Sequence, residues 1–172
     1  MNDNVTIRPL QDDDDFEWIT EVIHAGYAPL AALGLRFWGT HQSVQDTLDR
    51  FSKGAGFVAL LNDKIVGTVT IRPSDPESKV EFYRNPSTWI LNQFAVIPEY
   101  AGKGVGRALH DHAVDHALRN GATCIALDTA NAAEQLIAMY IKWGYTVVGA
   151  CDWRPDTNYE SVVLAKTLSS KS

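Results

Sequence analysis

The chain has 172 residues, of which 45% are hydrophobic and 21% are charged, and its formal net charge is −6. This length suits one domain with a sizeable core, and the composition argues against widespread disorder. The acidic balance, with a pI of about 5.3, argues against nucleic acid as a partner because polyphosphate would repel the protein.

The sequence shows no sign of a membrane or secretory segment. No run of about 18 apolar residues is present, so we expect no transmembrane helix and no membrane partner. Met1–Pro9 lacks the apolar core of a secretory signal. Cys124 and Cys151 stand far apart without ligand-like spacing, as small buried residues in a reducing compartment do. We therefore expect a cytoplasmic protein.

The first part of the chain alternates short strands and helices. Residues 5–10 predict a strand that ends near a proline. Apolar residues at helical spacing predict a helix from residue 13 onward, and a serine followed by an aspartate three residues later predicts a second helix over 43–51. The segments 56–61 and 65–71, rich in β-branched residues, predict a hairpin.

The remaining part predicts crossovers between strands. Residues 72–87 contain three prolines and predict an irregular insertion before a strand over 89–97. A helix over 105–120 then leads to a strand over 123–128, and a further helix over 133–143 ends at a glycine.

Two final strands are predicted at residues 145–151 and 161–166. The whole order indicates a single α/β (α+β) domain. We expect a mixed, mostly antiparallel central sheet of about seven strands, flanked by helices on both faces.

The most informative segment joins the strand over 89–97 to the following helix. Gly102, Gly104 and Gly106 follow one another on alternate residues, which lets the backbone turn tightly and approach a ligand without side-chain obstruction. The first turn of a helix leaves its N–H groups unpaired at the positive end of the helix dipole. Together these features predict an anion site that fits a diphosphate.

Two other kinds of phosphate-binding loop do not fit this segment. The P-loop string is absent, and Leu109 stands where a dinucleotide fingerprint requires its last glycine. A glycine-rich turn without a ligand is the remaining alternative, but three clustered glycines at such a joint cost conformational entropy.

The segment from Pro98 to Leu109 resembles the coenzyme A loop of the GNAT superfamily of N-acetyltransferases. The glycines, Val105 and Leu109 follow that family's pattern, whereas Ala101 stands where Arg or Gln is customary. Lys103 or Arg107 could supply the charge that this position lacks. The resemblance covers residues 3–170 as one domain.

A second family element is a helix that ends in a tyrosine and a glycine–aromatic pair. Here Tyr140 precedes Gly144-Tyr145 at the customary distance, and Asn131 lies two residues further upstream of Tyr140 than is usual. The resemblance implies that acetyl-coenzyme A is the co-substrate and that its binding residues are Phe94, Ala95, Val96, Ala101, Gly102, Lys103, Gly104, Val105, Gly106, Arg107 and Asn131.

The resemblance also implies a chemistry, the direct attack of a primary amine on the thioester in a ternary complex. The strand over 89–97 is expected to separate from its neighbour near Phe94–Val96, where a free main-chain N–H stabilises the oxyanion. Tyr140 is the expected general acid, which protonates the departing thiolate. A core aromatic with a satisfied hydroxyl is the alternative for Tyr140.

The general base is not fixed by the sequence. Asn92 and Gln93 carry amides, which cannot accept the proton. Glu81, Glu99, His24 and His41 are candidates, and a water relay is equally compatible with the sequence.

No metal site is expected. His112 and His116 are four residues apart, as zinc ligands on one helix face are, but Ala113 stands where a zinc protease needs Glu and no outside ligand cluster is evident. The run Asp12–Asp15 is interpreted as a charged helix N-terminus.

The acceptor is expected to be a small-molecule amine. Aromatic residues together with Asp and Glu favour a small cationic or aromatic amine. The aromatic residues are Trp38, Tyr83, Trp89, Trp153 and Tyr159. A catalytically degenerate coenzyme A sensor, and an acyltransferase with another donor or acceptor, are the alternatives. The sequence leaves a homodimer open.

Overall fold

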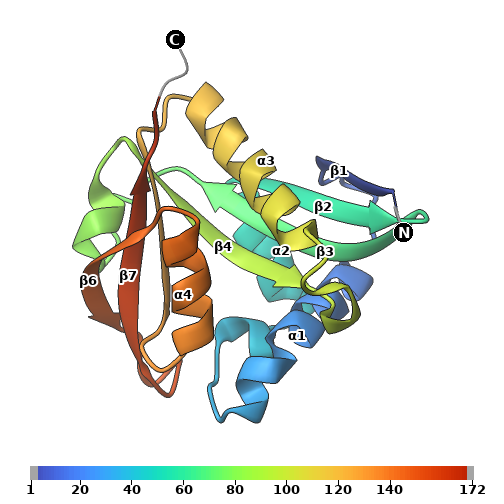
Figure 1. Ribbon diagram of the computed structural model, residues 1–172, viewed down its shortest axis with the longest axis horizontal. Helices are drawn as coiled ribbons and strands as arrows, with labels where there is room; N and C mark the ends of the chain where they lie inside the picture. Colours follow the sequence, from blue (N-terminus) through green and yellow to red (C-terminus); the bar gives the residue numbers. More distant parts are fainter. Residues whose placement is uncertain (1–3, 170–172) are drawn as a thin grey trace.

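The computed structural model describes residues 4–169 and forms one layered α/β unit (Figure 1). Residues 3 and 170, the ends expected for the domain, lie outside the described residues. The helices are α1 (Phe16–Ala32), α2 (Val44–Ser52), α3 (Val105–Arg119) and α4 (Glu134–Lys142). The strands are β1 (Val5–Pro9), β2 (Ala55–Leu61), β3 (Lys64–Arg72), β4 (Thr88–Val96), β5 (Cys124–Ala130), β6 (Thr146–Asp152) and β7 (Glu160–Thr167).

The seven strands form one sheet in the order β1-β2-β3-β4-β5-β7-β6. Only the pair β4–β5 is parallel, and the other neighbours are antiparallel. The predicted mixed, mostly antiparallel sheet is therefore confirmed.

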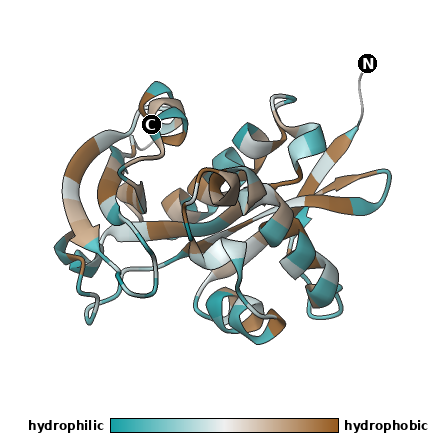
Figure 2. Ribbon diagram, turned by 90° about the horizontal axis from the view of Figure 1, so that it is seen from below, coloured by the Kyte–Doolittle hydropathy of each residue, from teal (hydrophilic) through white to brown (hydrophobic). Residues whose placement is uncertain are grey.

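Helices cover both faces of this sheet, because successive strand residues point to opposite sides. On β2, Phe57 and Ala59 belong to the core under α3 and α4, whereas Val58 belongs to the core under α1 and α2. Figure 2 shows hydrophobic residues along the central strands and hydrophilic residues in many of the surrounding loops.

Helix starts agree with the sequence pattern. The Asp15 side chain accepts a hydrogen bond from the Trp18 N–H at the start of α1. Ser43 and Asp46 form a reciprocal capping box at the start of α2, with N···O distances of 3.0 Å in both directions.

The sheet opens between β4 and β5, and this opening positions the site. The two strands pair only where Thr88–Ile90 faces Cys124–Ala126, so they separate from Leu91 onward. Opposite β3, the register of β4 shifts at Gln93, whose φ is +47°. A left-handed backbone at a residue other than glycine costs roughly 1–3 kcal/mol. Hydrogen bonds from Gln42 (2.6 Å) and to Thr70 (3.0 Å) hold the Gln93 side chain in place.

Candidate active site

A single cavity of about 1100 Å³ occupies this opening and extends to both faces of the sheet. One end is lined by the glycine loop and α4, and the other by α1, α2 and the loop before β7. The splayed part of β4, residues 91–96, lines the cavity between these two ends. The cavity therefore reaches residues on both sides of the sheet.

The glycine loop supplies main-chain donors at one end. Gly102 and Gly104 have φ values of +75° and +84°, which favour glycine, and both line the cavity. Gly104 is the N-cap of α3 and offers no side chain, and the first helical hydrogen bond runs from the Ala108 N–H to the Gly104 carbonyl. The N–H groups of the first turn are consequently available to an anion.

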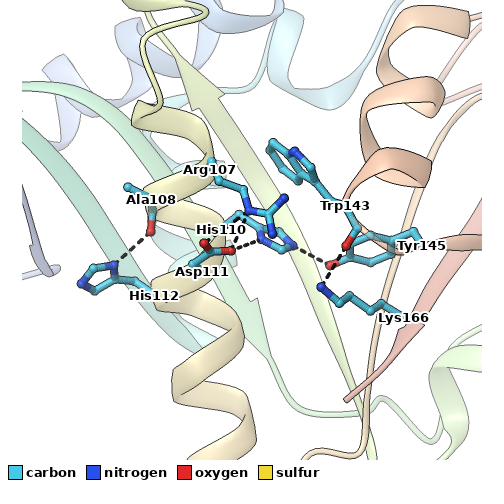
Figure 3. A network of polar contacts seen from close by, with 8 residues as sticks. All are labelled: Arg107, Ala108, His110, Asp111, His112, Trp143, Tyr145 and Lys166. Atoms are coloured by element: carbon cyan, nitrogen blue, oxygen red, sulfur yellow. Dashed lines mark hydrogen bonds and ion pairs between the residues drawn. The ribbon is translucent and has the colours of Figure 1, made fainter. Parts of the chain in front are cut away.

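A polar network fastens this helix to the end of α4 (Figure 3). His110 is fully buried, with its Nδ1 2.9 Å from the Asp111 carboxylate and its Nε2 2.8 Å from the Tyr145 hydroxyl. Burial lowers the pKa of His110 and favours the neutral ring, so Nδ1–H donates to Asp111 and Nε2 accepts from Tyr145. Arg107 lies 5.1 Å above the Trp143 ring, which lines the same cavity. The network thus fixes the loop relative to α4.

Tyr140 projects from α4 into the cavity with only 5% of its surface exposed. Its ring makes edge contacts with Trp143 and Tyr145, with centroids 5.7 and 5.4 Å apart. Among the described residues, no hydrogen bond to its hydroxyl is found, so the hydroxyl is free for a ligand. Burial raises the pKa of Tyr140 well above its ordinary value, and the phenol therefore stays protonated.

Comparison with known proteins identifies the family to which this arrangement belongs. The chain matches the Acetyltransferase (GNAT) family over residues 25–145, a span that includes β4, the glycine loop and Tyr140. The chain belongs to the GNAT acetyltransferase family.

Two N-acetyltransferases of Bacillus subtilis (strain 168) are similar to this GNAT protein. The S-(2-succino)cysteine N-acetyltransferase is 30% identical over 141 residues, which are 80% of this chain and 82% of that protein. The S-alkylcysteine N-acetyltransferase is 26% identical over 138 residues, which are 78% of this chain and 75% of that protein. Among solved structures, PaiA N-acetyltransferase from Thermoplasma acidophilum in complex with coenzyme A has a TM-score of 0.76 at 17% identity, covering 96% of this chain and 99% of that chain. The resemblance and the GNAT fold are confirmed.

Most of the GNAT cofactor residues expected from the sequence line the cavity, together with Tyr140. These residues are Phe94, Ala95, Val96, Ala101, Gly102, Gly104, Gly106 and Arg107. Three others do not line it. The Val105 side chain is buried in the core, Lys103 is exposed with Nζ 5.7 Å from the Tyr100 ring, and Asn131 is exposed in the turn after β5. The Asn131 N–H donates to the Glu160 carbonyl, next to the last pair of the β5–β7 ladder. The binding roles of all these residues stay predictions.

The end of this GNAT cavity opposite the glycine loop contains a half-buried carboxylate that the sequence did not reveal. Asp128, on the splayed part of β5, accepts hydrogen bonds from the Tyr83 hydroxyl and from Trp153 Nε1, the latter at 2.8 Å. Burial raises the pKa of Asp128, and these two hydrogen bonds act in the opposite direction. Tyr27 of α1 also lines the cavity, and burial raises the pKa of its phenol.

None of the four side chains expected as general bases lines the cavity. Glu81, Glu99 and His41 are exposed, and His41 stacks on Trp38 with ring centroids 5.5 Å apart. His24 Nε2 is 2.7 Å from the Gln42 carbonyl oxygen. Asp128, by contrast, lines the cavity from the part of β5 that is separated from β4.

The two α3 histidines considered as zinc ligands pack against aromatic rings of the sheet. The rings of His112 and His116 lie 6.4 and 5.6 Å from that of Phe57, and His116 also contacts Trp89 at 5.9 Å. Across residues 4–169, no group of three or more His, Cys, Asp or Glu side chains is arranged to hold a metal ion. In the same described range, no helix is long and apolar enough to cross a membrane.

Proposed function

We propose that this GNAT protein transfers the acetyl group of acetyl-coenzyme A to a primary amine of a small molecule. The single observation that carries this proposal is the cavity through the opened sheet, which places a helix N-terminus and a free phenol at one end and a polar aromatic pocket at the other. The two Bacillus subtilis relatives are described as N-acetyltransferases of substituted cysteines, which supports a small-molecule acceptor.

The chain's own residues fit the co-substrate that its family uses. The first turn of α3 has no side-chain cap and would hold the diphosphate. A Cβ at Gly102 or Gly104 would have no heavy atom within 4 Å, so the space beside this backbone is open to a ligand. The separated edge of β4 at Phe94–Val96 would bind the pantetheine arm. Acetyl-coenzyme A supplies an activated thioester carbonyl to this site.

Three groups of the chain would then serve the reaction. A main-chain N–H of the separated β4 edge donates to the carbonyl oxygen as it gains negative charge, an effect worth roughly 100- to 1000-fold in rate. Asp128, or a water bound to it, accepts the proton that the attacking amine loses. Tyr140, held protonated by burial, donates a proton to the departing thiolate.

The test is acetyl transfer to a panel of primary amines, followed by release of free coenzyme A thiol and by mass detection of the acetylated product. We expect transfer to at least one small amine and binding of coenzyme A in its absence. Coenzyme A binding without transfer to any amine would support the sensor alternative, and transfer only from another acyl donor would support the acyltransferase alternative. Cytoplasmic localisation and a homodimer stay predictions.

A further inference from the structure

Two arginines and several aspartates line the end of the cavity opposite the glycine loop, and the arginines have hydrogen-bonding capacity left over. Arg50 of α2 donates one hydrogen bond, from Nη1 to the Gln42 side-chain oxygen at 2.9 Å, and forms no ion pair within residues 4–169. Arg72, at the end of β3, has Nη2 3.6 Å from an Asp75 oxygen, whereas its Nε is buried and has no partner in the same range. An unpaired buried donor on a charged group costs free energy, and a ligand can recover that cost.

The fold brings together the end of α2 and the end of β3, which carry these two arginines. Gly54 follows α2 and packs so closely on β3 that a Cβ there would lie 2.7 Å from both the Cα and the Cβ of Arg72. Burial has the largest effect on the pKa of Arg50 and lowers it. Tyr27, Asp128 and Asp46 act in the opposite direction, and the positive charge of Arg72 adds a smaller lowering effect. Two cations that face one cavity repel each other, so an anion bound there would be stabilised by both.

The two carboxylates of α2 also line the cavity, but each already accepts a hydrogen bond within its own helix start or helix face. Asp46 accepts the Ser43 N–H in the capping box, and Asp49 accepts a hydrogen bond from Gln45 at 2.9 Å.

Groups that suit an amine lie beside the arginines. Asn92 Oδ1 is buried, lines the cavity and has no partner among the described residues. Arg72 pairs with Ile90 and Thr70 pairs with Asn92, so the Arg72 and Asn92 side chains lie on the same face of β3 and β4. Asp128 faces the same cavity from β5. A cationic pair next to two hydrogen-bond acceptors complements a zwitterion.

We propose that the acceptor is an α-amino acid whose carboxylate is bound by Arg50 and Arg72, an inference that rests on the proposed function. Its amino group lies toward Asn92 and Asp128, at the opening of the sheet where the thioester is attacked. An α-amino acid is a narrower class of acceptor than the small cationic or aromatic amine expected from the sequence, and that expectation stays a prediction. The aromatic rings around Asp128 then contact the side chain of the amino acid.

The experiment compares two acceptors that differ only in the carboxylate, S-methyl-L-cysteine and S-methylcysteamine. We expect the wild-type kcat/KM to be higher for the amino acid by roughly 10- to 100-fold, the range for hydrogen bonds to a charged group. In Arg72→Met and in Arg50→Met, this preference should fall at least tenfold, chiefly through KM for S-methyl-L-cysteine. Comparing the preference between proteins cancels the different basicity of the two amines.

Two further variants make the result specific. Arg119→Met removes one exposed positive charge on α3, far from the cavity lining, and should keep the wild-type preference. Arg72→Lys keeps the charge but not the planar fork, so it should retain part of the preference and rescue a folded site if Met perturbs packing.

The outcomes separate the two proposals. An unchanged preference in both Met variants, or equal wild-type turnover of the two acceptors, would overturn the arginine site while transfer itself still stands. Absence of transfer from acetyl-coenzyme A to every amine tested would overturn the proposed function, and the arginine site with it.

Discussion

Replacing Tyr140 with Phe isolates the contribution of one hydroxyl to catalysis. The ring packs against Trp143 and Tyr145, and Phe keeps both edge contacts. Because the hydroxyl has no hydrogen-bond partner among the described residues, its removal breaks no bond of the fold, and we expect the free energy of unfolding to change by less than about 0.5 kcal/mol. If Tyr140 protonates the leaving thiolate, the rate of the chemical step should fall roughly 100- to 10,000-fold, which is about 2.7–5.4 kcal/mol of transition-state stabilisation.

The Tyr145→Phe variant is the matched control. Tyr145 lies outside the cavity lining, and its hydroxyl bonds the buried His110 at 2.8 Å. Its removal leaves the His110 Nε2 without this partner, so stability should fall by about 1–3 kcal/mol while turnover is retained. Tyr140→Phe should therefore lower the rate of the chemical step, whereas Tyr145→Phe should lower the free energy of unfolding.

The assay measures coenzyme A thiol release in rapid mixing, together with thermal unfolding of each variant. Burial raises the pKa of Cys151 to about 12 and also raises the pKa of Cys124, so the protein's own thiols contribute little to the signal. Equal rates of the chemical step in wild type and Tyr140→Phe would refute the assignment of Tyr140 as general acid. A large loss of stability in Tyr140→Phe would instead show that the hydroxyl supports the fold.

Three further predictions concern the loop, an ion pair and the pH profile. Gly104→Ala should lower stability by about 1–2 kcal/mol in thermal unfolding because φ is +84° there, whereas Gly106→Ala, whose Cβ would lie 3.6 Å from Phe94, should not destabilise. Arg8 lowers the pKa of Asp14, so the stability from this pair is present above about pH 4 and is lost as pH falls. In denaturant titrations, Asp14→Asn should lower the free energy of unfolding by about 1 kcal/mol at neutral pH and leave it unchanged in strong acid. The rising limb of kcat/KM with pH should stay in place between two acceptors of different pKa, and a limb that follows the amine would exclude an enzyme-bound proton acceptor.

The order of strands and helices could be predicted because local signals agree with the fold. The Ser43 capping box and the glycines that end α3 and α4 act within a few residues, and each is visible in the sequence. The shift of β4 at Gln93 could not be predicted. It depends on Gln42 and Thr70, which hydrogen-bond its side chain from distant segments, and strand alternation carries no trace of such a left-handed residue.

The site was predictable only where one segment builds it. The glycine loop is contiguous, whereas the acceptor pocket gathers residues from α2, β3 and β5. Asp128 follows an apolar run, and this pattern indicates only a strand residue. Arg50 has the pattern of an ordinary positively charged helix residue. Their roles arise because the sheet opens and α2 packs on the end of β3, which are tertiary events. Because β5 extends to Ala130, Asn131 lies in an exposed turn outside the cavity lining, and its binding role stays a prediction.

The short pairing between β4 and β5 also has a mechanical consequence. Beyond Thr88–Ile90, no ladder joins β1–β4 to β5–β7, and the two halves of the sheet share mainly the core beneath α3. A molecule bound in the gap would contact both halves of the sheet, and its binding would increase the stability of the native state by mass action. Amide hydrogen exchange should therefore slow on both edges of the gap when coenzyme A binds.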